Sequence, residues 1–226
     1  AYSRVYPNNS LACNVIGFSS SEDNVGIGGI EQYYNDKLTG NNGREYGYLN
    51  DDSNLERVIK APKNGLSLVS TIDINIQQIV EKHIQQWEEE MGSKITACII
   101  MDPNNGEILA MASSRTFDLN NPRDLTKYYT DSEIENMSEE QKTEALNNIW
   151  LNFAISSTYE PGSPSKIFTV ATAMEEGVIN GNETYYCNGY QVVGQRKIHC
   201  ANKNGHGTIT VEEAIIQSCN DAMMQM

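Results

Sequence analysis

The sequence predicts an α+β fold, in which helices and antiparallel strands occupy separate stretches of the chain. Three observations support this prediction: an amphipathic stretch at residues 74–91, two strand-like runs within residues 95–112, and an apolar helical run that begins near residue 163. Hydrophobic residues make up 39% of the chain, which is enough for a core at a length typical of one or two domains.

The stretch Ile74–Met91 is typical of one long amphipathic helix. Apolar residues recur at three- and four-residue intervals, with Gln, Glu and Lys between them. Asp73 directly precedes the stretch and is a favourable N-cap residue. His83 falls on the apolar face, where we expect a packed core histidine rather than a functional one.

The following region predicts a β-hairpin. Residues 95–101 and 107–112 are rich in β-branched and other apolar residues, which is typical of strands. The five residues between them include Pro103 and the pair Asn105-Gly106, which favour a tight turn. We expect Cys98 to pack in the core as a small hydrophobic residue.

The segment at residues 115–150 is polar and acidic. We expect it to be a solvated excursion over the surface, with one helix near residues 131–146. The chain shows no internal repeat and no low-complexity tract.

The chain is strongly acidic, with 16 Lys and Arg against 30 Asp and Glu and a formal net charge of −14. This charge argues against binding to nucleic acid or to an anionic lipid surface, since both are polyanions. No apolar stretch reaches the roughly 20 residues that cross a bilayer as a helix, and we recognise no signal-peptide pattern in these residues.

The most informative short motif is Ser163-Pro164-Ser165-Lys166, at the start of the apolar helical run. Positions i and i+3 lie one above the other on a helix, so the Lys166 amine can reach the Ser163 hydroxyl. Pro164 suits the first helical position, which places Ser163 at the N-cap, where the helix dipole favours developing negative charge. A desolvated lysine can lose its proton near neutral pH, so this pair predicts a serine nucleophile with a lysine base.

A second motif, Ser218-Cys219-Asn220, follows at the head of another expected helix. Ser-x-x-Lys alone is a weak signal, because capping serines are often followed by solvated lysines. Together with a Ser-x-Asn sequence it is much more specific, since this combination is typical of penicillin-binding proteins and class A β-lactamases.

Four further residues form a candidate metal-ligand set: Cys187, Cys200, His206 and Cys219, with 12, 5 and 12 residues between them. Three thiolates and one imidazole suit a tetrahedral, closed structural zinc site. The spacing is not that of a zinc finger, so free buried thiols, one disulfide with a leftover thiol, and coincidence stay open. His199 is an alternative ligand, although neighbours on an extended chain point to opposite sides.

Residues 158–169 resemble the nucleophile region of the class B penicillin-binding proteins, the monofunctional D,D-transpeptidases. Ser165 departs from the family pattern, which usually has a bulky aromatic residue there; we expect altered packing more than altered chemistry. Residues 4–7, 15–18 and 28–44 are similar to the family's N-terminal pedestal, which β-lactamases lack.

The resemblance implies two domains. Residues 1–67 would form part of the pedestal, and residues 68–226 the N-terminal portion of the transpeptidase domain, an antiparallel sheet with helices on both faces. The third motif of the family, Lys-Thr-Gly or Lys-Ser-Gly, does not occur in the chain. We therefore expect the fold to be incomplete at the C-terminus, and these residues alone to be inactive.

The resemblance also implies a role for each site residue. Ser163 attacks the penultimate D-alanine carbonyl of a peptidoglycan stem peptide, and Lys166 takes the hydroxyl proton. Ser218 passes a proton to the departing D-alanine, and Asn220 hydrogen-bonds the substrate amide. An amine from a neighbouring stem then resolves the acyl-enzyme into a cross-link, whereas β-lactams trap the serine as a slowly hydrolysed ester.

Elongation-type members of the family can carry a zinc site in this region, so the resemblance implies structural zinc at Cys187, Cys200, His206 and Cys219. Carboxylates replace Cys187 and Cys200 in some relatives. The family further implies the extracytoplasmic face of the bacterial cell membrane, an anchor outside this chain, and a membrane-embedded glycosyltransferase of the elongation or sporulation machinery as partner. The sequence does not distinguish elongation from sporulation.

Two other interpretations stay open. A β-lactamase or β-lactam-sensing receptor shares the Ser-x-x-Lys fold, although the pedestal-like segments argue against both. A non-catalytic scaffold that docks cell-wall proteins belongs to a different class, but the intact Ser163, Lys166, Ser218 and Asn220 argue against a degenerate site.

Overall fold

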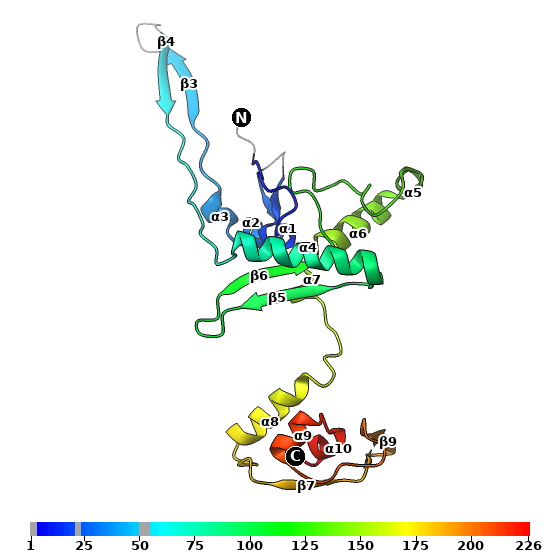
Figure 1. The fold of residues 1–226 in the computed structure, drawn as a ribbon. Helices are drawn as coiled ribbons and strands as arrows, with labels where there is room; N and C mark the ends of the chain where they lie inside the picture. The colour runs from blue at the N-terminus through cyan, green and yellow to red at the C-terminus, as the bar shows by residue number, and fades with distance from the viewer. Residues whose placement is uncertain (1–3, 21–23, 50–54) are drawn as a thin grey trace. The chain divides into compact units, whose positions relative to one another are not determined.

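The computed structural model describes residues 4–20, 24–49 and 55–226, and it divides into two compact units (Figure 1). The first unit is Ala1–Ser157 and the second is Thr158–Met226. Within the described residues the strands form five two-stranded sheets, all antiparallel, so the predicted α+β class is confirmed. No helix among these residues is long and apolar enough to span a bilayer.

The predicted domain boundary between residues 67 and 68 falls inside the first unit, and it stays a prediction. Parts of the predicted pedestal, at residues 1–3, 21–23 and 50–54, lie outside the described residues.

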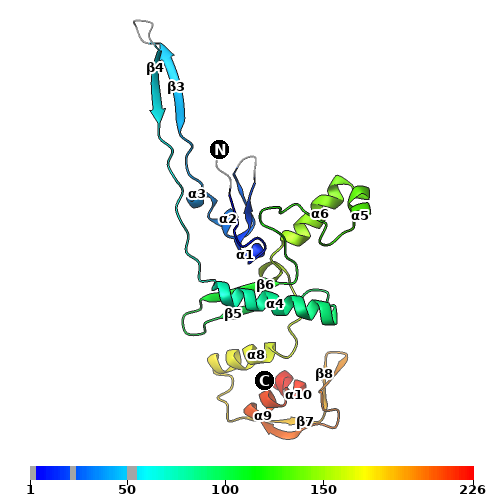
Figure 2. The same ribbon diagram turned by 45° about the horizontal axis from the view of Figure 1, so that its top comes forward.

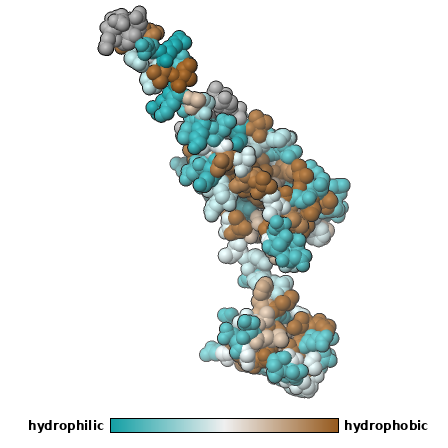
Figure 3. All heavy atoms as spheres, turned by 90° about the vertical axis from the view of Figure 1, so that its left-hand side faces the viewer, coloured by the Kyte–Doolittle hydropathy of each residue, from teal (hydrophilic) through white to brown (hydrophobic). Residues whose placement is uncertain are grey.

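The first unit begins with short elements and a longer hairpin, which are α1 (Cys13–Ile16), β1 (Phe18–Ser19), β2 (Gly26–Ile27), α2 (Gly29–Tyr33), α3 (Asn35–Leu38), β3 (Arg44–Leu49) and β4 (Leu55–Lys60). Gly17 has φ 72°, and a Cβ there would lie 2.0 Å from the Gly28 carbonyl oxygen. Only glycine therefore allows the backbone at residues 17 and 28 to approach this closely. The β3–β4 hairpin exposes Leu55 and Ile59, and Figure 3 shows apolar side chains interleaved with hydrophilic ones there.

The predicted amphipathic helix is confirmed as α4 (Ile74–Met91). The Asp73 carboxylate caps it, accepting hydrogen bonds from the backbone N–H groups of Asn75 and Ile76. The expectation of a core histidine is wrong, since His83 is exposed. The helix packs against a two-stranded hairpin. This hairpin covers only part of the apolar face of the helix, so His83 on that face stays exposed.

The predicted hairpin is also confirmed, as β5 (Ala97–Met101) paired with β6 (Ile108–Ser113). Gln77 of α4 is fully buried against it, and its amide pairs with the backbone of Met111 at 2.9 and 3.0 Å. This side chain satisfies one N–H and one C=O of β6 as a further strand would. The surrounding apolar cluster consists of Val80, Ile84, Ala110 and Ala112.

The expectation of a solvated excursion at residues 115–150 is wrong. This segment supplies much of a core that also contains Tyr6, Cys13 and Phe18, through Phe117, Leu119, Leu125, Ala145, Leu146 and Ile149. The single predicted helix is two, α5 (Asp131–Asn136) and α6 (Glu139–Trp150). Ser138 begins α6 with a capping box, which explains the break. The last helix of the unit is α7 (Phe153–Ser156).

The second unit carries the residues of both predicted motifs. Its elements are α8 (Ser165–Glu175), β7 (Thr184–Cys187), β8 (Tyr190–Val193), β9 (Arg196–His199), β10 (Gly207–Thr210), α9 (Val211–Ile216) and α10 (Asn220–Gln225). β7 pairs with β10 and β8 pairs with β9. In Figures 1 and 2, α9 and α10 lie between α8 and β7. One small core joins the helices through Val170, Ile179 and Val211, and a second contains Cys187, Cys200 and Cys219.

Candidate active site and metal centre

Ser163 is exposed in a tight turn just before α8. Gly162 has φ 62°, in the left-handed region that glycine adopts freely, and its carbonyl accepts hydrogen bonds from the backbone N and Oγ of Ser165 at 3.1 and 2.6 Å. The Ser163 carbonyl accepts from the Lys166 backbone N–H at 3.0 Å. This turn delays the α-helix, so Pro164 and not Ser163 stands at the N-cap, which corrects the predicted position by one residue.

Lys166, on the first turn of α8, links the two sequence motifs. Its Nζ donates hydrogen bonds to the carbonyl oxygen of Ser218 at 2.6 Å and to the Ser218 Oγ at 3.0 Å. Among the described residues it makes no hydrogen bond to the Ser163 hydroxyl. Catalytic hydrogen bonds often shorten only when substrate binds, so this geometry is compatible with the predicted role of Lys166 as base.

Ser218 lies at the junction of α9 and α10. Its backbone N–H donates to the Ile215 carbonyl at 3.0 Å, and the Cys219 N–H donates to the Ala214 carbonyl at 2.9 Å. These bonds form a Schellman motif, whose left-handed position is usually occupied by glycine. Ser218 occupies it with φ 50°, so the backbone is strained where the second motif meets Lys166.

We predict that this strain is measurable. A non-glycine residue in the left-handed region costs roughly 1–2 kcal/mol, so Ser218→Gly should exceed Ser218→Ala in free energy of unfolding by about 1 kcal/mol. Both variants lack the hydroxyl, so the comparison isolates the backbone term. Urea denaturation of the full-length protein measures the difference, and equal stabilities would contradict the strain.

Asn220 opens α10, and its side chain is held in a defined orientation. The Asn220 Nδ2 donates to the carbonyl oxygen of His199, the last residue of β9, at 2.9 Å. This bond uses one of the two amide hydrogens and leaves the second for a ligand. This contact could not be predicted from the sequence, because the acceptor is a backbone group whose position depends on the β8–β9 pairing.

The structure brings together all four predicted metal ligands. The three sulfurs and one imidazole nitrogen of Cys187, Cys200, His206 and Cys219 lie within 4.8 Å of one another. The His206 Nδ1 is 3.5 Å from the Cys187 Sγ and 3.6 Å from the Cys200 Sγ, and the Cys200 and Cys219 sulfurs are 3.8 Å apart. This last distance is far longer than the ~2.05 Å of a disulfide.

Local structure explains this convergence. The register of β7 and β10 pairs Cys187 with Gly207, which carries the adjacent His206 into the cluster. Gly205 has φ 81°, and a Cβ there would lie 2.3 Å from the Cys187 carbonyl oxygen, so the connecting loop requires glycine. Cys219 is the N-cap of α10.

The thiols of the cluster differ in acidity. Burial and the neighbouring thiol groups of Cys187 and Cys200 raise the pKa of Cys219 to about 12. Burial also opposes ionisation of Cys200, but backbone N–H groups, first that of Asn202 and then that of Asn220, lower its pKa below the ordinary value. Without a cation, then, the cluster does not hold three thiolates near neutral pH.

The alternative ligand of the sequence analysis is not in this group. His199 is exposed, with its ring 6.1 Å from that of Tyr190. Cys13 and Cys98 belong to the first unit, and all five cysteines are free thiols.

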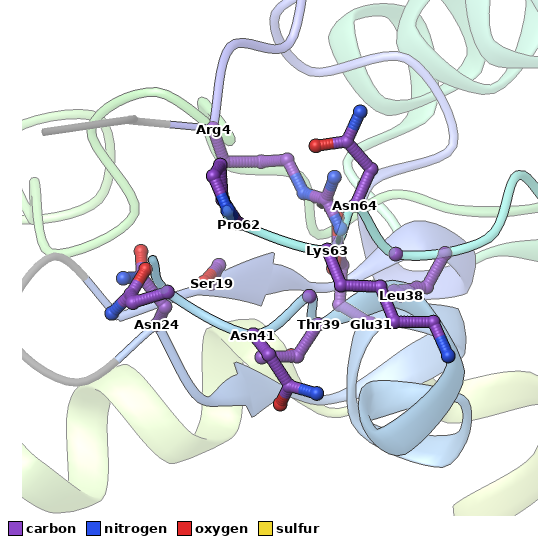
Figure 4. Close-up of a pocket in the computed structure, with 13 residues that line it drawn as sticks. Arg4, Ser19, Asn24, Glu31, Leu38, Thr39, Asn41, Pro62, Lys63 and Asn64 are labelled. Carbon is purple, nitrogen blue, oxygen red and sulfur yellow. Dashed lines mark hydrogen bonds and ion pairs between the residues drawn. The ribbon is translucent and has the colours of Figure 1, made fainter. Parts of the chain in front are cut away.

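A separate polar pocket of about 350 Å³ lies in the first unit (Figure 4). Arg4 and Glu31 form an ion pair at 2.9 Å in it, and none of the predicted catalytic residues lines it. Tyr6 donates a hydrogen bond to Glu31; burial and this carboxylate raise the Tyr6 pKa to about 12, so the phenol stays protonated. We assign this pocket no catalytic role.

Comparison with known proteins independently supports the family resemblance seen in the sequence motifs. Residues 96–226 match the family model described as the penicillin-binding protein transpeptidase domain. The chain is 32% identical to stage V sporulation protein D of Bacillus subtilis, over 99% of this chain and 32% of that protein. It is 26% identical to peptidoglycan D,D-transpeptidase MrdA of Escherichia coli, over 99% of this chain and 37% of that protein.

Solved structures show the same similarity. Penicillin-binding protein 3 of Mycobacterium tuberculosis aligns with a TM-score of 0.70 at 27% identity, covering 98% of this chain and 42% of that one. The chain thus spans about a third of the length of the curated relatives it matches.

Proposed function

Since the chain belongs to the transpeptidase domain family of the class B penicillin-binding proteins, we propose that it is part of a serine D,D-transpeptidase that cross-links peptidoglycan stem peptides. The observation that carries this proposal is the pair of hydrogen bonds from the Lys166 Nζ to Ser218. They join the nucleophile turn to the second motif within one compact unit.

The geometry supports the following acylation step. The Ser163 Oγ attacks the carbonyl carbon of the penultimate D-alanine, and its proton passes to the Lys166 amine, which acts as the general base. The Ser218 hydroxyl, 3.0 Å from that amine, relays a proton to the departing nitrogen of the terminal D-alanine. The products are free D-alanine and an ester on Ser163.

The second step uses the same groups in reverse. The amine of a neighbouring stem attacks the ester carbonyl, forms the cross-linking amide and returns the proton to Ser163. The Asn220 Nδ2 hydrogen that His199 leaves free can hydrogen-bond the substrate amide in both steps. A β-lactam presents a strained amide at the same place and forms an ester that hydrolyses slowly.

We also propose structural zinc at Cys187, Cys200, His206 and Cys219. A tetrahedral zinc with Zn–S of ~2.3 Å and Zn–N of ~2.0 Å requires sulfurs ~3.8 Å apart and sulfur–nitrogen separations of ~3.5 Å. The Cys200–Cys219, Cys187–His206 and Cys200–His206 distances of 3.8, 3.5 and 3.6 Å fit this donor set, and all four donor atoms lie within 4.8 Å of one another. When bound, the cation would stabilise the thiolates that the cluster otherwise does not hold.

Such zinc would act on the site through the backbone. Cys219 stands between Ser218 and Asn220, and Cys200 follows the His199 carbonyl that holds the Asn220 amide. Fixing these two sulfurs therefore limits the motion of the whole second motif.

The setting of the activity is also proposed by similarity. The resemblance favours the extracytoplasmic face of the bacterial cell membrane, with a membrane-embedded glycosyltransferase as partner. The 32% identity to a stage V sporulation protein favours sporulation over elongation.

The full-length protein, incubated with polymerised glycan that carries pentapeptide stems, should release D-alanine and form dimeric stems. Release of D-alanine without dimers would indicate a carboxypeptidase instead. Absence of both products from a folded protein would favour the scaffold interpretation and contradict the proposal.

A further inference from the structure

Asp221, the residue after the second motif, is fully buried. Among the described residues it forms no salt bridge, although isolated buried carboxylates are costly. Its two oxygens instead accept hydrogen bonds from N–H donors: the Oδ2 accepts from the Asn188 backbone N–H at 3.0 Å, and the Oδ1 accepts from the Gln225 Nε2 at 2.7 Å. The fold therefore retains a buried carboxylate that the acylation mechanism does not use.

Gln225 lies one turn further along α10 and completes the arrangement. The Gln225 Nε2 also donates to the Tyr186 carbonyl oxygen at 3.0 Å. Tyr186 and Asn188 flank Cys187 in the sequence. The backbone groups on both sides of this sulfur ligand are therefore held by two side chains of α10.

The first turn of α10 contacts the other two sulfurs as well. The Cys219 Sγ accepts from the Ala222 backbone N–H at 3.4 Å, and the Cys200 Sγ lies 3.8 Å from the Cys219 Sγ in the same buried core as Ala222. The same turn carries the Asn220 amide. One rigid element thus positions three sulfurs and a group expected to contact substrate.

We propose that Asp221 and Gln225 form a clamp, a pair of positioning residues that pre-assemble the metal centre and couple it to Asn220. This inference rests on the proposed zinc and on the proposed function. Because the clamp holds Cys187 against α10 without any metal, it lowers the cost of ordering the ligands when zinc binds. Residues that orient metal ligands in this way typically change metal affinity 10–100-fold when replaced.

The test compares Asp221→Asn and Gln225→Met with the wild-type full-length protein. Asp221→Asn keeps the shape but presents an amide NH₂ to one of the two donors. Gln225→Met keeps the length at an exposed position, so this variant is expected to fold even where a change at the buried site does not. Glu212→Gln is the matched control, an exposed acid in the same unit that undergoes the same change of charge.

Three quantities are measured: zinc affinity by competition with a chromophoric chelator, the absorption spectrum with cobalt in place of zinc, and the rate of acylation by penicillin. We expect both clamp variants to bind zinc about 10–100-fold more weakly and to show shifted cobalt bands. Acylation should fall at limiting zinc and recover at saturating zinc. The control should match the wild type in all three.

The outcomes separate the hypotheses. Clamp variants with wild-type zinc affinity and cobalt spectrum, even if less stable, would overturn the clamp and leave the proposed function intact. A wild-type protein that is acylated but binds neither metal would contradict the metal centre and the clamp with it. A wild-type protein that binds zinc but is never acylated would contradict the proposed function alone.

Discussion

Replacing Ser163 by alanine in the full-length protein is expected to abolish covalent labelling by a fluorescent penicillin, because the ester requires the Ser163 Oγ. Lys166→Ala should leave the nucleophile in place but remove its base. General-base catalysis typically contributes 10²–10⁴-fold, so labelling of this variant should slow by at least about 100-fold. The second-order rate constant, from label incorporation against time and concentration, measures both effects.

The neighbouring serine provides the matched control. Ser165→Ala removes a hydroxyl two positions away, whose hydrogen bond goes to the Gly162 carbonyl and not to Ser163, Lys166 or Ser218, while the Ser165 backbone N–H keeps its bond to the same carbonyl. We expect this variant to label at a rate close to that of the wild type. Covalent labelling of Ser163→Ala, or loss of labelling in Ser165→Ala alone, would contradict the assignment of the nucleophile.

Removal of zinc is expected to lower both stability and acylation rate. A ligand present at 1,000 times its Kd stabilises the folded state by about 4 kcal/mol, which corresponds to a fall in Tm of about 10 °C for an unfolding domain of about 150–250 residues. Loosening Cys219 frees both Ser218 and Asn220, so penicillin acylation should slow about 10-fold or more. Thermal melting and label incorporation, before and after chelation, measure the two changes.

Zinc should reverse both changes when added back. Cys219→Ser, which removes one ligand, is expected to resemble the chelated protein and to respond little to further chelation. Acylation of the metal-free protein at the rate of the metal-loaded one would show that the cluster does not support the second motif.

Local motifs explain why much of the site could be predicted from the sequence. Three features depend only on residues that are close together along the chain: the Ser163–Lys166 spacing, the Asp73 cap and the hairpin turn. The types of these residues are enough to predict each feature. The four proposed metal ligands could be selected from the sequence because Cys and His are rare in this chain, and a group of them suggests a shared role. Their convergence depends on the β7–β10 register, which spacing alone does not fix.

The errors arose where long-range packing overrides local pattern. Residues 115–150 are mostly polar, so the sequence predicted a solvated segment. Its few apolar residues are in fact buried by the N-terminal segment, as where Phe117 packs against Phe18. The left-handed backbone of Ser218 had no sequence signal, because glycine is the usual residue there. Asp221 and Gln225 read as ordinary polar residues at a helix start; only the tertiary fold buries the carboxylate.

The most direct test of the central claim is intact-mass spectrometry of the full-length protein with penicillin, under native and denaturing conditions. We expect a penicilloyl adduct that maps to the peptide containing Ser163, together with the mass of one zinc ion that is lost on denaturation. An adduct without zinc would support the transpeptidase assignment but contradict the zinc site, and the cysteines would then be free thiols. A folded protein that forms no adduct would contradict the assignment of Ser163 as an acylated nucleophile.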